Sequence, residues 1–451
     1  MTVGPTPVPF ARDNRPAPPV RMIHLGLGNF FRAHQAWYTA HAADSGEWGI
    51  AAFTGRSPAV AETLSAQDGL YTLVTRAHER DEFETVRALS HTYPASDTES
   101  WLGLFATSQV AVVTLTVTEA GYLRGEDGGL DHQDLAVAAD IAALRADVRA
   151  GCSTAVGRLV AGLAARRAAG AGPIALVPCD NLPGNGAVLA RLVREFAELT
   201  QPSLTRWIDS HVCFVTSAVD RITPATTPDD SALVERTLGY RDAAPVVTEP
   251  FREWVLCGDF PAGRPGWESS GAVFTSDVTP YENRKLWLLN GAHSLLAYTA
   301  PLRGHRTVAS AVRDQVCRTW LDLWWREAEP HTGLPGADLG AYRRALLERF
   351  ANPRIRHRLE QIAMDGSKKL PVRILPVLHR ERTAGRIPEG AVRAIAGWVC
   401  HLTGHGVPVS DPGAAGVHDI DSALARLDPS LGVDVPLRAA ILNEMHRLRN
   451  G

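Results

Sequence analysis

The sequence has no long apolar run, no block of basic residues and no closely spaced pair of cysteines. Because no stretch of about 18 apolar residues occurs, we expect no membrane-spanning helix. A formal net charge of −3 without a basic cluster offers no surface for nucleic acid or an anionic membrane. The six cysteines stand singly, so the ligand spacing of a structural zinc site is missing and we expect no bound metal.

Scattered single cysteines are also typical of reduced thiols, which predicts a cytoplasmic protein. Prolines interrupt the N-terminal segment MTVGPTPVPFARDNRPAPPV, so it does not fit a secretory signal peptide. No interface signature is readable. A monomer and a small homo-oligomer both stay open.

The 451 residues favour two domains, and the pattern changes near Asp277–Pro280. Before this point, short apolar runs alternate with helical segments, which predicts a parallel α/β sheet. After it, strand-like runs nearly vanish and apolar residues recur at helical spacing. We therefore predict an α/β protein with a Rossmann-type NAD(P)-binding domain over residues 1–278 and a mostly α-helical substrate and catalytic domain over 279–451. The expected strands are Met22–Leu25, Ile50–Phe53, Val110–Val117, Ile174–Val177 and Val212–Thr216; the expected helices include Phe30–Ala43, Ala59–Ser65, Glu282–Ala300, Val308–Glu327, Leu339–Phe350, Pro353–Ala363, Gly390–Leu402 and Leu437–Leu448.

A two-glycine turn follows the first expected strand and opens a helix. Backbone N–H groups at such a position bind the pyrophosphate of a dinucleotide. The fingerprint has a third glycine, where this chain has Phe31, so a plain tight turn is the alternative. The predicted coenzyme-binding residues here are Gly26, Gly28, Asn29, Phe30, Phe31 and Arg32.

The acid that binds the ribose 2′-OH in NAD-specific domains is absent after the second strand. Arg56 and Ser57 stand there instead and are suited to a 2′-phosphate, which favours NADP. Arg56 lying across the adenine or in solvent is the alternative. The preference between NAD and NADP therefore stays open.

Polar residues follow three of the expected strands, at the sheet edge where open α/β sheets bind ligands. Asn181 lies in the stretch CDNLPGNG, Asp220 precedes Arg221, and Thr118 precedes Glu119. Each alone fits a turn or a helix cap. Together they predict a ligand-binding edge, with Thr118 among the coenzyme-binding residues.

Lys285, Asn290 and His293 fall on one expected helix, in YENRKLWLLNGAHS. At 100° per residue, Asn290 lies about 140° and His293 about 80° from Lys285, so one broad face presents all three. A lysine in a dry pocket becomes a general base, and a carboxamide binds a developing alkoxide. A solvated lysine and a structural histidine are the alternative.

These segments together resemble the mannitol dehydrogenase family, the polyol-specific long-chain dehydrogenases. The matching stretches span residues 24–373 in order. They are HLGLGNFFRAHQAWYT, LTVTEAGY, PCDNLPGNG, AVDRITP, EPFREWVL, GRPGWE, DVTPYENRKLWLLNGAHSLLAY and RFANPRIRHRLEQIAMDGSKKLPVR.

The resemblance implies metal-independent hydride transfer between NAD(P) and the C2 alcohol of a linear sugar derivative, in a cleft between the two domains. It implies a general-base role for Lys285, binding of the reacting oxygen by Asn181 and Asn290, and orientation of the substrate by His293. It further implies that Asp220 and Lys369 bind substrate.

One departure bears on the substrate. The resemblance implies an arginine on the helix before the D-G-S turn in mannitol-active members, and this chain has Gln361 there. The stretch QIAMDGSKKLPVR is more similar to fructuronate reductases, which makes Arg373 a candidate carboxylate partner. Arg373 as a structural ion-pair partner is the alternative. Mannonate/fructuronate, mannitol/fructose and a polyol phosphate stay open as substrates. The rival from another class is a non-catalytic NAD(P)-binding regulator.

Overall fold

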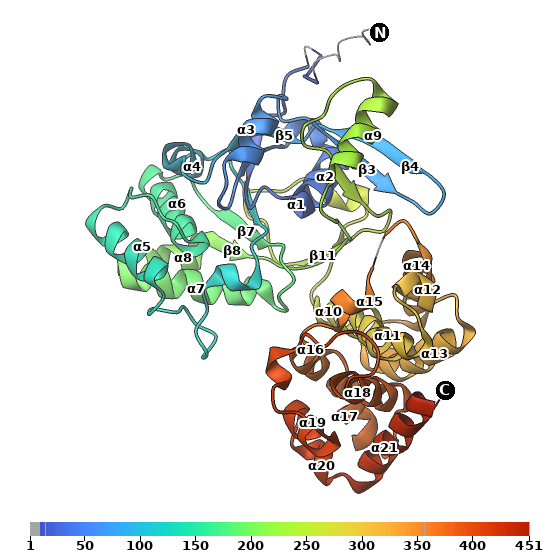
Figure 1. The fold of residues 1–451 in the computed structure, drawn as a ribbon. Coiled ribbons are helices and arrows are strands. Elements are labelled where there is room, and N and C mark those ends of the chain that lie inside the picture. Colours follow the sequence, from blue (N-terminus) through green and yellow to red (C-terminus); the bar gives the residue numbers. More distant parts are fainter. Residues whose placement is uncertain (1–9, 14, 356, 451) are drawn as a thin grey trace. The chain divides into compact units, whose positions relative to one another are not determined.

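Contacts in the computed structural model divide the chain into two compact units, one ending at Val278 and the other beginning at Thr279 (Figure 1). The structure describes residues 10–13, 15–355 and 357–450. The first unit is a Rossmann-type α/β domain and the second is mostly helical, so the predicted fold class is confirmed.

The N-terminal unit is built on a six-stranded parallel sheet in the order β5-β2-β1-β6-β7-β8. Numbered along this sheet alone, the order is 3-2-1-4-5-6, that of dinucleotide-binding domains. The strands are β1 (Val20–Leu25), β2 (Gly49–Phe53), β5 (Leu89–Tyr93), β6 (Val112–Leu115), β7 (Ile174–Pro178) and β8 (Val212–Phe214).

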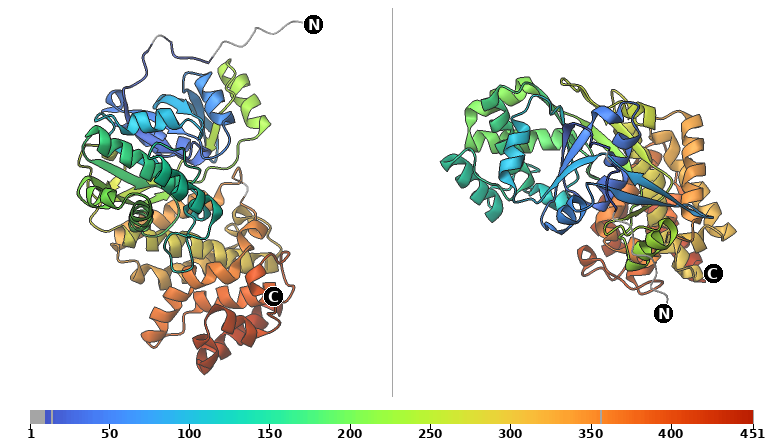
Figure 2. Two further views of the ribbon diagram at one scale, coloured as in Figure 1. Left: turned by 90° about the vertical axis from the view of Figure 1, so that its left-hand side faces the viewer. Right: turned by 90° about the horizontal axis from the view of Figure 1, so that it is seen from above.

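Helices cover both faces of this sheet. Neighbouring residues of a strand point to opposite faces, so each strand contributes side chains to two cores. Met22 and Ala52 belong to the core formed with α1–α3, whereas Ile23 and Ala51 belong to the core formed with α4–α8. Figures 1 and 2 show α5–α8, coloured teal to green, together on one side of the sheet. The helices are α1 (Asn29–Ala33), α2 (Gln35–His41), α3 (Ala59–Ser65), α4 (Thr98–Phe105), α5 (Leu135–Ala146), α6 (Ala155–Ala169), α7 (Asn185–Thr200) and α8 (Pro202–His211).

Two predicted elements of this unit are interrupted. The helix expected over Phe30–Ala43 breaks at His34, whose backbone lies outside the helical region and separates α1 from α2. The strand expected over Val212–Thr216 ends at Phe214, and β9 (Thr216–Asp220) begins after Val215 in a second sheet.

The two smaller sheets have three strands each and were not predicted. One has the order β10-β3-β4 and the other β12-β11-β9. Their elements are β3 (Tyr71–Arg76), β4 (Asp81–Val86), β10 (Val246–Thr248), β11 (Glu253–Cys257) and β12 (Val273–Phe274), with helix α9 (Pro228–Leu238).

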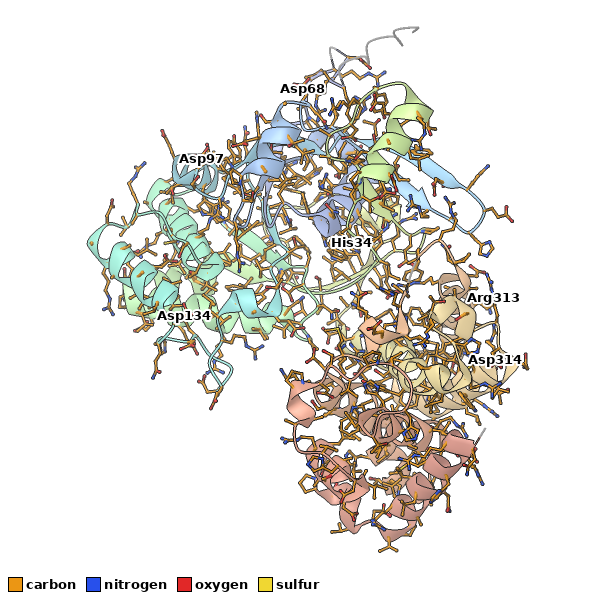
Figure 3. The ribbon with its side chains drawn as sticks, in the orientation of Figure 1. His34, Asp68, Asp97, Asp134, Arg313 and Asp314 are labelled. Atoms are coloured by element: carbon orange, nitrogen blue, oxygen red, sulfur yellow. The ribbon has the colours of Figure 1, made fainter. Side chains whose placement is uncertain are left out.

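Aspartates begin several helices by capping their first N–H groups. Asp97 accepts from Ser100 N at the start of α4, and Asp134 accepts from Ala136 N at the start of α5. Figure 3 labels both, together with Asp314, which caps α13 (Gln315–Ala328). Each such cap contributes about 1 kcal/mol to helix stability.

Two neighbouring helices form the centre of the C-terminal unit. Helix α11 (Ala292–Thr299) packs against α18 (Glu389–Leu402), which is buried throughout from Gly390 to His401. The other helices are α10 (Thr279–Arg284), α12 (Val308–Ala311), α13 (Gln315–Ala328), α14 (Gly336–Ala351), α15 (Leu359–Ala363), α16 (Gly366–Arg373), α17 (Leu375–Thr383), α19 (Ile420–Leu427), α20 (Ser430–Val433) and α21 (Val435–Asn450).

Three of the helices expected in this unit need correction. The segment Pro353–Ala363 is helical only from Leu359, and Val308–Glu327 is divided after Val312 by the Asp314 cap. The expected helix Glu282–Ala300 contains a π-helical segment, η4 (Lys285–Gly291), between α10 and α11. Among the described residues, none of the helices combines the length and the hydropathy needed to span a bilayer.

Candidate active site

The turn after β1 is held between two neighbouring strands. The N–H groups of Gly26 and Leu27 both donate to the carbonyl of Phe53 at 2.9 Å. Gly26 has φ +110°, and a Cβ there would lie 2.3 Å from the carbonyl oxygen of Thr116. Only glycine fits at this position, because the chain approaches another backbone closely in a conformation that side chains disfavour.

The second glycine of the turn serves a different purpose. Gly28 has φ −117°, and the nearest atom to a Cβ added there is 3.6 Å away. It is exposed and stands directly before α1. The fold itself does not need glycine here, so the open backbone fits a ligand that approaches closely, as a pyrophosphate does.

The remaining residues of the turn divide into buried and accessible ones. Phe31 is fully buried and stacks on His24 at 3.4 Å between ring centroids. Arg32 is also buried and donates to the carbonyl of Ala244 and, at 2.7 Å, to Asn29 Oδ1. Their side chains stabilise the turn, while Asn29 and Phe30 are partly exposed.

The other predicted coenzyme-binding residues lie past the carboxyl ends of β2 and β6. Arg56 and Thr118 are both exposed. No carboxylate occurs between Phe53 and Pro58. The end of β2 therefore presents a cation where an NAD-specific domain presents an acid.

The segment with Asn181 is anchored on both sides. Asp180, whose pKa is raised by burial, accepts from the Tyr122 hydroxyl and from Leu182 N at 3.1 Å. The buried amide of Asn185 exchanges two hydrogen bonds with the backbone of Ser217, at 2.9 and 3.0 Å. Asn181 itself is exposed at this edge, so its amide is presented on a fixed loop.

Asp220 ends β9 and is buried, 6% exposed, opposite Glu253 of β11. The neighbouring Arg221 donates to the carbonyls of Glu249 and Ala33, which fixes the chain directly after Asp220. Asp180, Asn185 and Arg221 thus hold the candidate residues of this unit in place. Sequence reasoning missed Asp180 and Asn185 as anchors, although both lie in the polar stretch that it selected.

In the C-terminal unit, Lys285 and Asn290 lie in η4, and His293 lies in the first turn of α11. All three are partly exposed, while Trp287 and Leu288 between them are buried. An i→i+5 helix has more residues per turn than an α-helix, so Lys285 and Asn290 stand a little over one turn apart and close to the same side. The π-helical segment brings the two closer in direction than the α-helical prediction did.

Aromatic rings surround His293. The ring of Phe350 lies 4.7 Å from it between centroids, and the ring of His357 lies 5.4 Å away at 86°. Burial lowers the pKa of His357. A neutral His357 leaves His293 facing no second imidazolium, which suits a histidine that orients a substrate hydroxyl.

Helix α16 supplies Lys369 and Arg373. Arg373 Nη1 lies 3.3 Å from the hydroxyl of Ser294, the residue after His293. The structure therefore brings α16 next to α11, the helix that carries His293. Lys369 donates to the carbonyl of Ile362 at 3.2 Å, and Lys368 is exposed. Burial lowers the pKa of both Lys369 and Arg373.

The start of α16 is fixed by a residue far along the chain that sequence reasoning missed. Asp411 accepts from Ser367 N at 2.7 Å, from the Ser367 hydroxyl at 2.5 Å and from Trp398 Nε1 at 3.3 Å. Asp365, the residue before α16, adopts a left-handed backbone with φ +55°. Asp411 thereby orients the helix that carries Lys369 and Arg373.

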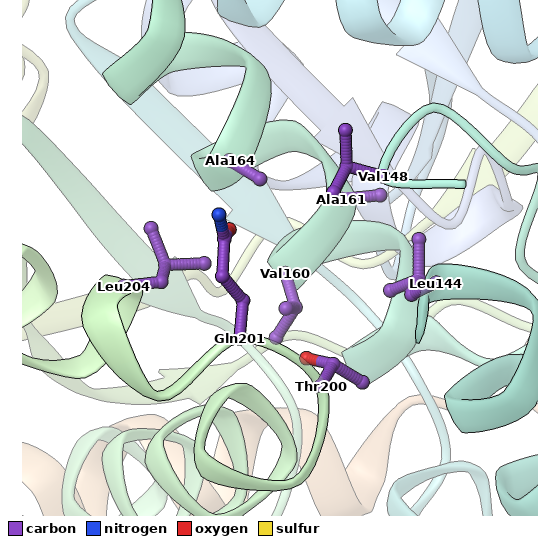
Figure 4. A pocket seen from close by; sticks show the side chains of 8 residues that line it. All are labelled: Leu144, Val148, Val160, Ala161, Ala164, Thr200, Gln201 and Leu204. Carbon is purple, nitrogen blue, oxygen red and sulfur yellow. The ribbon is translucent and has the colours of Figure 1, made fainter. Parts of the chain in front are cut away.

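Two other features contain none of the predicted site residues. His305, Asp314 and Cys317 form the one cluster of possible metal ligands found among the described residues, but Arg303 Nε already lies 2.7 Å from Asp314. An apolar pocket lies between α5, α6 and the α7–α8 connection (Figure 4).

The family is shown by comparison with known proteins. Residues 20–269 match the mannitol dehydrogenase Rossmann domain, and residues 277–427 match the mannitol dehydrogenase C-terminal domain. D-mannonate oxidoreductase of Escherichia coli is 37% identical over 407 residues, which cover 87% of this chain and 83% of the relative.

Solved structures agree with this relationship. The crystal structure of D-sorbitol dehydrogenase in substrate-free form superposes with a TM-score of 0.89 at 28% identity, over 98% of this chain and 97% of that one. Mannitol 2-dehydrogenase of Pseudomonas fluorescens, in a ternary complex with NAD and D-mannitol, gives 0.78 at 32% identity, over 98% and 94%.

The fold and the glycine turn define an NAD(P)-dependent oxidoreductase. This chain belongs to the mannitol dehydrogenase family.

Proposed function

We propose that this enzyme interconverts the C2 alcohol and ketone of a linear six-carbon sugar derivative, with a sugar acid of the mannonate/fructuronate type as its preferred substrate. Lys285 is the general base and no metal takes part. The single observation that carries the substrate choice is the environment of Arg373.

Arg373 is a mostly buried cation, and within the part of the chain that the structure describes its side chain has one hydrogen bond, to Ser294. No carboxylate among the described residues forms an ion pair with it, so the structural ion-pair alternative lacks support. A desolvated guanidinium needs an anion to offset the loss of water, and Arg binds carboxylates with two hydrogen bonds. The C1 carboxylate of a hexonate would supply that anion, and mannitol has none. The similarity to D-mannonate oxidoreductase points the same way.

In the oxidative direction, Lys285 removes the proton of the C2 hydroxyl. Asn181 and Asn290 donate hydrogen bonds to the oxygen as it gains negative charge, and His293 fixes the orientation of the substrate. Asp220 and Lys369 bind hydroxyl groups along the chain of the sugar. NAD(P), bound at the turn of Gly26, Gly28 and Asn29, supplies the hydride acceptor.

Coenzyme preference follows from the end of β2. Because Arg56 is exposed there and no acid accompanies it, we propose that NADP is accepted at least as well as NAD. The regulator hypothesis loses its basis, since residues 20–269 and 277–427 match both domains of a family of oxidoreductases.

The deciding experiment measures initial rates with fructuronate and with fructose, each with NADH and NADPH. We expect faster turnover of fructuronate. Arg373→Met should lower kcat/KM for fructuronate about a hundredfold, because truncating one partner of a buried charge pair loses about 2–5 kcal/mol, and it should leave fructose nearly unchanged. The matched control is Lys368→Met, which removes an exposed cation five residues away. Faster turnover of fructose by the wild type would contradict the sugar-acid proposal and identify a hexitol enzyme.

A further inference from the structure

Two adjacent tryptophans on α13 contact the backbone of the π-helical segment. Trp324 Nε1 donates to the carbonyl of Trp287 at 2.9 Å, and Trp325 Nε1 donates to the carbonyl of Leu288 at 2.9 Å. Both indoles are fully buried. Consecutive side chains thus bind consecutive carbonyls in the middle of η4 (Lys285–Gly291).

These carbonyls lie where the hydrogen-bonding pattern of the helix changes. From Lys285 to Gly291 the backbone hydrogen bonds follow the i→i+5 pattern, and from Ala292 onwards, in α11, they follow the i→i+4 pattern. A change from the longer to the shorter step passes over one carbonyl, which needs a partner outside the helix. A buried carbonyl without a partner is unfavourable, so the indoles of Trp324 and Trp325, which donate to the carbonyls of Trp287 and Leu288, stabilise the π-helical form over the α-helical one.

The fit between the two helices is close. A Cβ on Gly291 would lie 2.6 Å from the Trp324 ring, so the absent side chain lets the indole reach the helix. Helix α13 is bonded to α18 as well, because Glu327 accepts from Gly390 N at 2.8 Å and from Ala391 N at 3.1 Å at the start of α18. The donors are therefore held by a rigid support.

We infer that Trp324 and Trp325 are positioning residues, which hold the π-helical segment and thereby place Lys285 and Asn290 on one side of the helix. In an α-helix, five residues would separate the two by about 140°. In the π-helical segment, which has more residues per turn, they lie a little over one turn apart and closer in direction. The tryptophans act through the backbone and touch neither reacting atom. This inference rests on the proposed role of Lys285 as the base.

The test replaces each indole donor by a ring without one, as Trp324→Phe, Trp325→Phe and the double variant. We expect each single variant to lower kcat about tenfold and the double variant about a hundredfold, with KM and the Kd for NADH within about twofold of wild type. The acidic limb of the kcat profile should shift relative to wild type, since Lys285 loses its fixed surroundings. Trp320→Phe is the control, because Trp320 lies on the same helix and stacks with Arg303 and Arg393 instead.

Amide hydrogen exchange over Lys285–Ala292 reads the segment directly, whatever the role of Lys285. We expect faster exchange there in the Phe variants than in the wild type, and the wild-type rate of exchange in Trp320→Phe. Unchanged exchange, or kcat and a pH profile like those of Trp320→Phe while Lys285→Ala is inactive, would overturn the inference and leave the proposed function standing. Activity of Lys285→Ala within tenfold of wild type would refute the proposed base and the positioning role together. If the Phe variants do not fold, Gly291→Ala displaces the Trp324 ring by its added methyl and must show the same loss of kcat.

Discussion

The two glycines of the β1–α1 turn should respond to alanine in opposite ways. In Gly26→Ala, the new Cβ would lie 2.3 Å from the Thr116 carbonyl oxygen, and the residue would have to keep φ +110°. A side chain in such a region of backbone space is unfavourable by about 1–3 kcal/mol, and overpacking adds about 1–3 kcal/mol. We expect this variant to lose about 2–6 kcal/mol of stability in the N-terminal unit.

In Gly28→Ala, the nearest atom to the new Cβ lies 3.6 Å away, and φ of −117° suits alanine. Stability should stay within about 0.5 kcal/mol of wild type, as for a surface substitution. The methyl group would occupy the space that the pyrophosphate approaches, so the Kd for NADH should rise at least tenfold, a loss of about 1.4 kcal/mol.

Urea unfolding and fluorescence titration with NADH measure these two quantities separately. Gly26→Ala should unfold at lower urea, while Gly28→Ala should unfold with wild-type stability and bind NADH weakly. Wild-type affinity for NADH in Gly28→Ala would refute the coenzyme placement. Wild-type stability in Gly26→Ala would refute the account of the turn.

Three further changes test other parts of the molecule. Lys285→Ala should lower kcat by about two to four orders of magnitude, the usual contribution of a positioned base, and steady-state rates within tenfold of wild type would exclude that role. Asp411→Ala leaves Ser367 N and Trp398 Nε1 without their acceptor, so kcat/KM for the sugar acid should fall more than tenfold while the Kd for NADH holds; an unchanged kcat/KM would show that α16 needs no such support. Burial raises the pKa of Glu327 from 4.5 to about 7, so its carboxyl favours folding below pH 4.5 and this contribution is lost as the pH rises through 7. Relative to Glu327→Gln, urea unfolding of the wild type should therefore lose about 3 kcal/mol between pH 4.5 and pH 7.5, and a constant difference across that range would contradict the shift.

The central sheet was predictable because its strands are buried on both faces. Such strands read as continuous apolar runs, and β1, β2, β6 and β7 were found where those runs occur. The adjoining helix α3 was also predicted with its observed bounds, Ala59–Ser65.

The smaller sheets could not be predicted in the same way. Strand β3 pairs with β4 nearby but with β10 some 170 residues later, and β10 has three residues. Strands this short carry no periodicity of their own. They exist because distant segments pair, which local sequence does not record.

The candidate residues of the site were recognisable by type and spacing, but the residues that hold them were not. Asp411 supports Ser367 from 44 positions away, and Trp324 reaches Trp287 from 37. An aspartate in a loop and a tryptophan in an amphipathic helix are ordinary on their own. Their roles follow from tertiary packing alone.

The spacing Lys285, Asn290, His293 acquires a clear meaning once the π-helical segment is known. A step of five followed by a step of three fits poorly to a uniform α-helix, where it spreads the side chains over about 140°. The first step is a little over one turn of an i→i+5 helix, and the second, a near turn, leads from η4 into the first turn of α11. A uniform α-helix would need Asn at position 288 or 289, which leucines occupy in the apolar core. The chain thus keeps its core leucines and still directs the lysine and the asparagine to the same side, provided that the π-helical segment is stabilised from outside by α13.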